Sequence, residues 1–215
     1  MRSRSALLSI ALTAVYVLFF LWYTPLGGPL SPEEIDLYLE RIAADGLSEA
    51  DQQSLREFLE TDTGGDFAMV NVIELREPPT RVEGVGPQES ASDVLNKYMA
   101  YMWPALLRRA CHPVLAGGAA AGAADLWGLD ERARAWSQGA AMRYRSRRDM
   151  MEIATNPAFQ PSHAFKQAAM LKTIAFPIDP WFHFGDPRLL GALFLAIGLL
   201  SIRLVASWPR SRAST

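Results

Sequence analysis

The sequence predicts a mixed α+β domain held between two membrane-spanning helices. Half of the 215 residues are apolar, and a long run without charge lies near each end of the chain. Between the two runs, helix-start signals alternate with short β-type apolar segments, as in one domain of ordinary size. All 23 acidic residues also lie between the runs. These observations predict two anchors with a water-soluble domain between them.

The first apolar run, from Ala6 to Tyr23, carries no charge. At 1.5 Å per residue its helix is about 27 Å long, close to the hydrocarbon thickness of a bilayer. A cleaved signal peptide is the alternative, because Arg2 and Arg4 form a positive N-terminal region. The aromatic end, Phe19 to Tyr23, is typical of a membrane interface and favours an uncleaved anchor over residues 1–24.

The second apolar run extends from Leu189 to Ile202. If Arg203 reaches the headgroups with its long side chain, the span continues to Trp208. A buried core helix is the alternative interpretation, but the terminal position and the basic residues that follow argue against it. We predict a second transmembrane helix over residues 187–208.

Positive charge is distributed unevenly along the chain. Segment 24–188 has 16 basic and 23 acidic residues, a net charge of −7, and the other five basic residues are Arg2, Arg4, Arg203, Arg210 and Arg212. The positive-inside rule therefore predicts that both termini are cytoplasmic. In a bacterium the anchors would lie in the inner membrane and the domain in the periplasm. An acidic domain repels phosphates, which excludes nucleic acid as a partner.

A helical hairpin is predicted directly after the first anchor, over residues 31–62. The segment Ser31–Glu34 combines an N-cap serine, a proline at the first helical position and a glutamate at the third, which is a capping box. The helix that follows is expected to stop at Gly46. A second helix begins at Ser48 and ends before Thr63.

Four strands are predicted within the domain at 66–180. Their alternating or β-branched segments are residues 67–75, 113–119, 133–144 and 172–178. With the intervening helices, the element order is β-α-β-β-α-β, the ferredoxin-like topology. We expect one antiparallel sheet in which the first strand lies in the interior and pairs with the last.

Three helical segments accompany these strands. The first runs from Ser90 to Cys111, and Pro104 is expected to kink or break it. A short helix begins at Ser146, and a further helical segment extends from Asn156 to Met170. The helices that begin near Ser90 and Ser146 are expected to cover one face of the sheet.

Several short motifs suggest a family. They are Met69–Ile73, Tyr98–Arg109, Arg143–Arg148, Asn156–Phe159 and His163–Lys166. Together they resemble the dimeric α/β-barrel superfamily, and in particular its uncharacterised members, over roughly residues 66–178. Arg145 stands where those relatives have the proline of an Arg-Tyr-Pro-Ser turn. The resemblance implies that two sheets pack face to face and that a ligand, where there is one, lies between sheet and helices.

Candidate ligand-binding residues follow from this resemblance. Cofactor-free monooxygenases of the superfamily use an asparagine with a tryptophan and a histidine, for which Asn71, Trp103 and His112 are present. A pocket near Asn71, Tyr98, Trp103 and His163 is therefore one hypothesis. The alternative is structural, because a buried amide such as Asn71 also closes local hydrogen-bond networks, and His163 also fits a hydrogen bond near the Asn156–Pro157 turn.

Two arginines are further candidates. Arg143 and Arg145 alternate along the predicted strand, so a shared anion site and pairing with acids of their own chain are both open. Cys111 is the only cysteine, and its apolar surroundings favour a buried hydrophobe over a reactive thiol. No metal-binding spacing is present among the three histidines. We assign no catalytic residue, metal or cofactor.

Two classes of function remain. The first is a non-enzymatic scaffold or accessory subunit of an envelope membrane complex. The second is a membrane-tethered enzyme or small-ligand binder of the dimeric α/β-barrel type, similar to a monooxygenase. In both, helices on one side leave the second face of the sheet in need of cover. A homodimer, a membrane-protein partner and the hairpin at 31–62 are the three possible covers.

Overall fold

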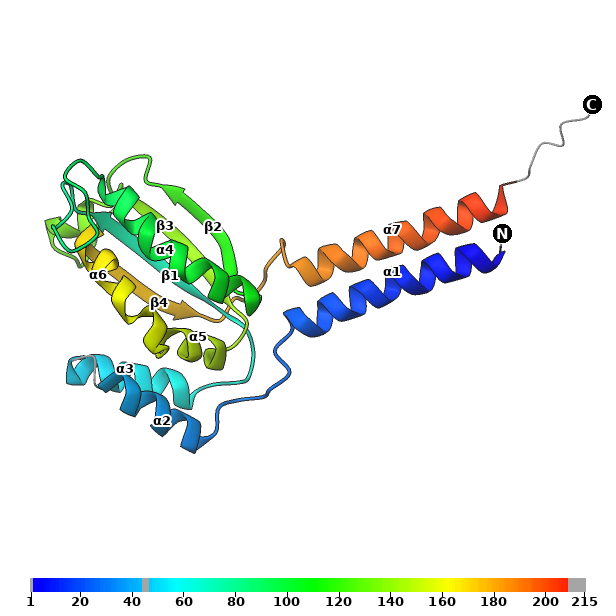
Figure 1. Cartoon of the computed structure of the whole chain (residues 1–215), viewed down its shortest axis with the longest axis horizontal. Coiled ribbons are helices and arrows are strands. Elements are labelled where there is room, and N and C mark those ends of the chain that lie inside the picture. The colour runs from blue at the N-terminus through cyan, green and yellow to red at the C-terminus, as the bar shows by residue number, and fades with distance from the viewer. Residues whose placement is uncertain (1, 44–46, 209–215) are drawn as a thin grey trace, which may run out of the picture. The chain divides into compact units, whose positions relative to one another are not determined.

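The structure is a computed structural model that describes residues 2–43 and 47–208 (Figure 1). It forms two compact units. One consists of the two ends of the chain, up to Thr24 and from Trp181 onward, and the other is the central unit Pro25–Pro180. We describe each unit by itself.

The terminal unit consists of two apolar helices, α1 (Arg2–Tyr23) and α7 (Pro187–Ser207). Within the described residues both are long and apolar enough to cross a membrane. They pack closely because small residues of α7 face larger residues of α1. A Cβ atom at Gly198 would lie 2.7 Å from Leu12, and one at Gly191 would lie 3.0 Å from Tyr16. The basic residues Arg210 and Arg212 lie outside the described residues.

The central unit begins with a pair of helices, α2 (Pro32–Ala43) and α3 (Glu49–Glu60). The predicted capping box is confirmed: the Ser31 N–H donates to the Glu34 carboxylate at 2.9 Å, and the Glu34 N–H donates to Ser31 Oγ at 3.3 Å. Ser48 caps α3 by accepting the Asp51 N–H. The predicted stop at Gly46 lies outside the described residues.

The sheet contains β1 (Phe67–Leu75), β2 (His112–Gly118), β3 (Gln138–Tyr144) and β4 (Met170–Ile178). All neighbouring strands are antiparallel, and their order is β2-β3-β1-β4. The prediction that the first strand lies in the interior and pairs with the last is therefore confirmed.

The third strand begins later than the sequence predicts. Residues Glu131–Arg134 form a short 3-10 helix, η1, and β3 begins only at Gln138. Asp130 stabilises this turn by accepting the Arg132 N–H at 2.7 Å, and Arg134 donates to Glu131 at 2.8 Å. The alternation of side chains predicts a strand for this segment, but these short-range polar contacts stabilise a turn instead.

The helices on the sheet are α4 (Ala91–Arg108) and α6 (Gln160–Ala169), which lie side by side across one face (Figure 1). Ser90 caps α4 with a complete capping box, and the helix continues through Pro104 without a break. The predicted segment from Asn156 is divided: Pro157–Phe159 is a 3-10 turn, η2, before α6. At its other end β4 already begins at Met170.

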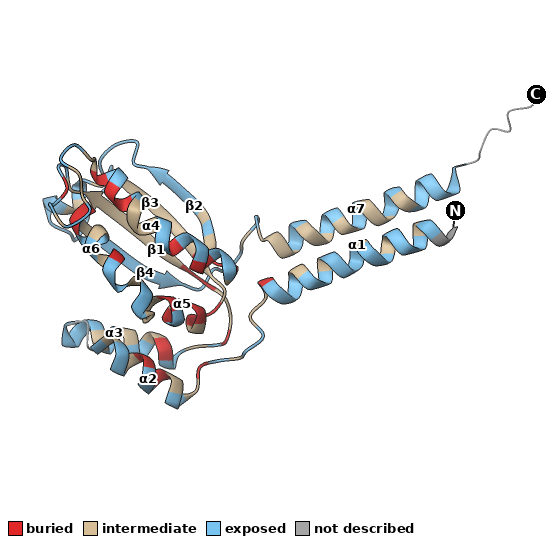
Figure 2. Ribbon diagram, viewed as in Figure 1, coloured by how far each residue is buried: buried red, intermediate tan, exposed pale blue. Residues whose placement is uncertain are grey.

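The short helix α5 (Arg147–Ala154) occupies the predicted place only in part. The helix that packs along α4 is α6, whereas α5 meets α4 through Ile153. One side of α5 places Met151 in a cluster with the α2–α3 pair, and Ile153 belongs to the core beneath α4. Buried residues are therefore frequent along α5 (Figure 2), and this helix joins the hairpin to the sheet domain.

Candidate functional site

The two faces of the sheet differ in what covers them. Residues that lie directly opposite each other in antiparallel strands point to the same face. Phe67 lies opposite Tyr144, with stacked rings 5.4 Å apart, and Met69 lies opposite Met142. Because Tyr144 and Met142 pack against the core beneath α4, this set of residues faces the helices.

The alternate residues form the second face. Val70 lies opposite Ala141 and Phe176, and Val72 lies opposite Ile174. We call this surface the open sheet face, defined by Val70, Val72, Leu115, Ile174, Phe176 and Ile178. Its residues on the edge strands β2 and β4 are the most exposed, with exposed fractions of 73% for Leu115, 46% for Phe176, 43% for Ile174 and 39% for Ile178. Exposed apolar surfaces of this kind are typical of interaction sites, so this face is the candidate functional site.

The helical hairpin does not cover this face in the part of the chain that the structure describes. Ile35, Tyr38 and Leu59 of the hairpin instead form a cluster with Met151 of α5. Phe58 of α3 also meets Phe67, at the start of β1, with ring centroids 5.1 Å apart. Of the three predicted covers, the two intermolecular ones remain.

Polar residues lie at both ends of the open sheet face. At one end, Glu74 lies opposite Lys172, whose ammonium group lies 4.4 Å from the centroid of the Trp136 ring. Glu74 Oε2 is buried without a hydrogen-bond partner among the described residues. At the other end, Arg143 lies opposite His112. The open sheet face is therefore an apolar surface between two polar ends, and the arginine at one of these ends is buried.

The two predicted anion-binding arginines are paired with acids of their own chain. Arg143 is buried, and it donates through Nε to Asp66 at 2.8 Å and through Nη1 to the Ala110 carbonyl at 2.8 Å. Arg145 lies just beyond the end of β3 and binds both carboxylate oxygens of Asp149 at 2.8 Å. This geometry favours the structural alternative over an anion site.

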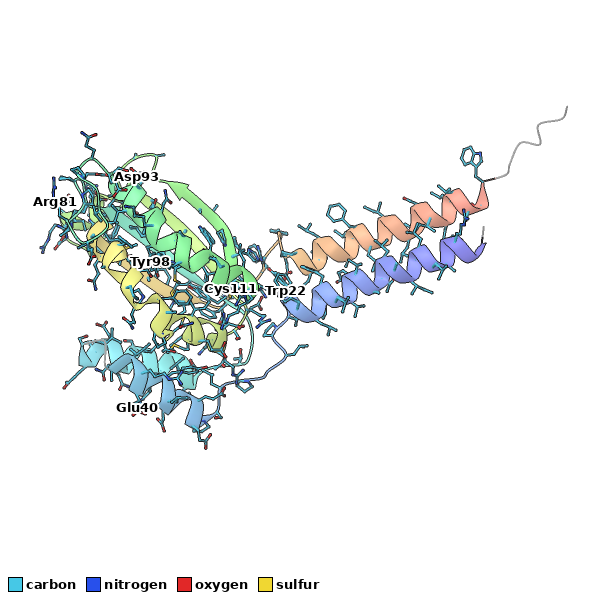
Figure 3. The ribbon with its side chains drawn as sticks, in the orientation of Figure 1. Trp22, Glu40, Arg81, Asp93, Tyr98 and Cys111 are labelled. Atoms are coloured by element: carbon cyan, nitrogen blue, oxygen red, sulfur yellow. The ribbon has the colours of Figure 1, made fainter. Side chains whose placement is uncertain are left out.

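The four residues of the predicted pocket are only partly brought together. Tyr98 lies on α4 (Figure 3), and its ring contacts that of His163 in α6, with centroids 6.1 Å apart. Burial raises the pKa of the Tyr98 hydroxyl. Asn71 satisfies its amide locally by donating to the Met69 carbonyl at 3.0 Å. Trp103 is exposed on α4. Of the predicted pocket, the structure therefore shows the contact between Tyr98 and His163.

Two other chemically reactive residues lie near the start of β2. The Nδ1 atom of His112 lies 3.0 Å from the Pro113 carbonyl oxygen. Cys111 is fully buried, its Sγ accepts the Arg145 N–H at 3.5 Å, and burial raises the thiol pKa to about 11. Among the described residues no group of three or more His, Cys, Asp or Glu could hold a metal ion.

The residues of the open sheet face were not identified from the sequence, although an uncovered face was expected. Ile174, Phe176 and Ile178 recur with a period of two, a signal that sequence reasoning can use. Leu115 is harder to assign, because the pairing of β2 shifts register between Pro113 and Leu115. Only the observed register assigns it to this face.

No protein-family model and no curated protein matches the chain. Solved structures similar to part of it include methylated RPA0582, with 19% identity, coverage of 62% of this chain and 93% of that chain, and a TM-score of 0.49. A second crystal structure, of the RPA0582 protein of unknown function from Rhodopseudomonas palustris, is 18% identical, covers 61% of this chain and 94% of that chain, and has a TM-score of 0.49. The structure of At3g17210 from Arabidopsis thaliana is 13% identical, covers 54% of this chain and 97% of that chain, and has a TM-score of 0.34. None of these descriptions names an activity.

Proposed function

We propose that this protein is a membrane-anchored scaffold or accessory subunit of an envelope membrane complex, and that it docks to its partner through the open sheet face. The apolar helices α1 and α7 support the anchoring. The net charge of −7 between two basic ends supports an inner-membrane protein with cytoplasmic termini and an extracytoplasmic central domain.

We assign the central domain to the ferredoxin-like topology. The strand order β2-β3-β1-β4 and the position of α4 and α6 on one face support this assignment. They also agree with the resemblance to the dimeric α/β-barrel superfamily, in which the sheet face opposite the helices is covered by another sheet.

The exposed apolar surface of the sheet is the observation that carries the proposal. Apolar area removed from water contributes about 25 cal/mol per Å², and Leu115, Ile174 and Phe176 each leave a large part of their side chain exposed. A second copy of the chain and a membrane-protein partner both fit this surface. Two anchors per chain also raise the effective concentration of partners in the same membrane.

The ligand-binding alternative has less support. Its polar candidates already have partners within the chain: Asn71 bonds Met69, and Arg143 and Arg145 bond Asp66 and Asp149. Only the contact between Tyr98 and His163 remains in its favour. For this reason we place the function at the open sheet face rather than between sheet and helices.

Crosslinking of the full chain in native membranes tests the docking surface. We expect the wild type to form a crosslinked dimer or a complex with another membrane protein. Phe176→Asp should weaken this association roughly a hundredfold or more, because burying a carboxylate in an apolar contact costs several kcal/mol. Leu37→Asp, at an exposed apolar position on α2, is the matched control. Only monomers in the wild type, or equal effects of both substitutions, would contradict the proposal.

Reporter fusions test the orientation independently. An enzyme that is active only outside the cytoplasm should work when fused at a loop position such as Val85 and fail when fused after Thr215. The reverse pattern would reject the predicted topology, whatever the outcome of the crosslinking experiment.

A further inference from the structure

Arg203 is an unusual residue within an apolar helix. It lies four residues before Ser207, the last residue of α7, which corresponds to about 6 Å along the helix axis. Arg203 has no hydrogen bond or ion pair with any residue that the structure describes, although most other arginines of the chain have one. A charged side chain at membrane depth is costly unless it is paired, and it points to a functional site.

Arg203 lines a groove between α1 and α7. The groove has a volume of about 550 Å³, and its walls include Ser9, Thr13, Ala14, Val17, Leu199 and Arg203. It combines a cation and two hydroxyl groups with an apolar floor. Neither Ser9 nor Thr13 has a side-chain hydrogen bond to another described residue, so their hydroxyl groups are available to a ligand.

The carboxylate side chain of the terminal unit, Asp186, lies at the other end of α7 from Arg203, 17 residues or about 25 Å along the helix. No acidic residue occurs before Glu33 or after Asp186 in the sequence, and Asp186 pairs with Arg188 at 2.6 Å. Arg4 lies at the same end of the helix pair and lines a second groove of about 390 Å³ that also includes Ser201 and Val205. Both guanidinium groups therefore lie at one end of the helix pair, and Asp186 lies at the other end.

We propose that the Arg203 groove binds one anionic phospholipid. The guanidinium group and the hydroxyl groups of Ser9 and Thr13 would bind the phosphate and glycerol region, and an acyl chain would lie against Val17 and Leu199. A lipid phosphate fits better than a carboxylate of a neighbouring transmembrane helix, because Arg203 is close enough to the helix end for its side chain to reach the headgroup layer. This inference rests on the proposed membrane insertion of α1 and α7.

Native mass spectrometry of the full chain in a neutral detergent tests the site. The protein is titrated with palmitoyl-oleoyl phosphatidylglycerol and, separately, with the phosphatidylcholine of the same acyl chains. We expect tighter binding of phosphatidylglycerol to the wild type. Arg203→Gln should weaken it about fivefold, the effect of one basic residue near a lipid surface, and Arg203→Lys should retain part of the preference.

Two matched controls distinguish binding of the lipid in the Arg203 groove from non-specific electrostatic attraction of the lipid to the protein. Arg4→Gln removes the same charge at the same end but lines the other groove, and it should weaken binding less than twofold. Ala14→Trp fills the Arg203 groove and should reduce binding, whereas Ala11→Trp, on α1 outside both grooves, should not.

The contrary outcomes are distinct. Equal binding of the two lipids by the wild type, or equal effects of Arg203→Gln and Arg4→Gln, would overturn the lipid site. Extraction of membranes at alkaline pH reports on the underlying assumption. A chain that stays in the membrane pellet but shows no headgroup preference refutes the lipid site alone, while a chain released into the supernatant refutes the proposed anchoring.

Discussion

Arg148 and Glu34 form a two-point ion pair that joins α5 to the first turn of α2. Arg148 Nε lies 2.6 Å from one carboxylate oxygen of Glu34, and Nη2 lies 2.8 Å from the other, across 114 residues of sequence. The same guanidinium group donates to the carbonyl oxygens of Gly28 and Pro29 at 3.2 Å. One arginine therefore holds both the hairpin and the segment that leads into it.

Replacing Glu34 with glutamine should loosen the hairpin. Glutamine keeps the capping contact with Ser31 but removes the charge that pairs with Arg148. Since both side chains are partly exposed, we expect a loss of about 1 kcal/mol. Hydrogen exchange of the α2 amides, followed by mass spectrometry, should become about fivefold faster. Glu40→Gln, on the exposed side of the same helix, should leave the exchange unchanged.

The contribution of Glu34 should also depend on pH. The hydrogen bonds from Arg148 lower the pKa of Glu34 to about 2, below the usual range for glutamate near 4.3. A lowered pKa means that the stabilisation is complete above about pH 4.5 and is lost as the pH falls towards 2. The difference between wild type and Glu34→Gln should therefore shrink between pH 6 and pH 3. A constant difference would show that the ion pair is not its cause.

Arg147→Met should destabilise the central domain more strongly. The buried Arg147 side chain donates to the Phe58 carbonyl and to Thr61 Oγ1, and it lies 3.6 Å from Asp62, which is also buried. Removing the cation leaves the Asp62 carboxylate buried without its ion-pair partner, so we expect a loss of about 3 kcal/mol in the free energy of unfolding. Urea titration of the full chain in detergent, followed by circular dichroism, measures this loss.

The control for this substitution is Arg132→Met. Arg132 pairs with Asp130 on the surface, where its side chain is 90% exposed, and an exposed pair adds little to stability. We expect no measurable change. If both methionine variants behave alike, burial of the Arg147 ion pair is not what stabilises the domain.

Two glycines with similar backbone angles should respond differently to alanine. Gly64 has φ = 76°, and a Cβ atom there would lie 2.6 Å from the Gly28 carbonyl carbon; Gly28 has φ = 67° but open space around it. A left-handed angle costs a non-glycine residue roughly 1–2 kcal/mol. We therefore expect about 1 kcal/mol for Gly28→Ala and about 3 kcal/mol for Gly64→Ala, where the clash with backbone is added. Equal losses in urea titration would contradict the close approach.

Cys111 should resist alkylation in the folded protein. Burial raises its pKa to about 11, so at pH 8 only roughly 0.1% of the thiol is ionised, and the sulfur is inaccessible. Mass spectrometry after treatment with iodoacetamide at pH 8 should find no adduct on the native chain and one adduct after unfolding in urea. Ser92→Cys, at an exposed position of α4, should add one rapidly modified site. Rapid native labelling of Cys111 would reject its role as a buried hydrophobe.

Local chemistry in the sequence by itself determined where most elements begin. The helix starts after Ser31, Ser48, Ser90 and Ser146 are each set by a hydroxyl group that accepts a backbone N–H within three residues, so a short window of sequence contains the whole interaction. The strand Phe67–Leu75 was predicted with its observed bounds for the same reason, because its alternation is complete within the segment. The two long apolar helices depend only on composition over about 20 residues.

Only the tertiary structure decided which partner each polar residue takes and which surface stays open. Arg143, Arg147 and Arg148 reach acids or carbonyl groups 33 to 120 residues away, and no local pattern specifies those distances. Leu115 and Phe176 belong to one exposed face because the register of three strand pairs aligns them. A shift of one residue in any pairing would turn that strand's side chains to the other face, so the open sheet face is a property of the assembled sheet rather than of any of its strands.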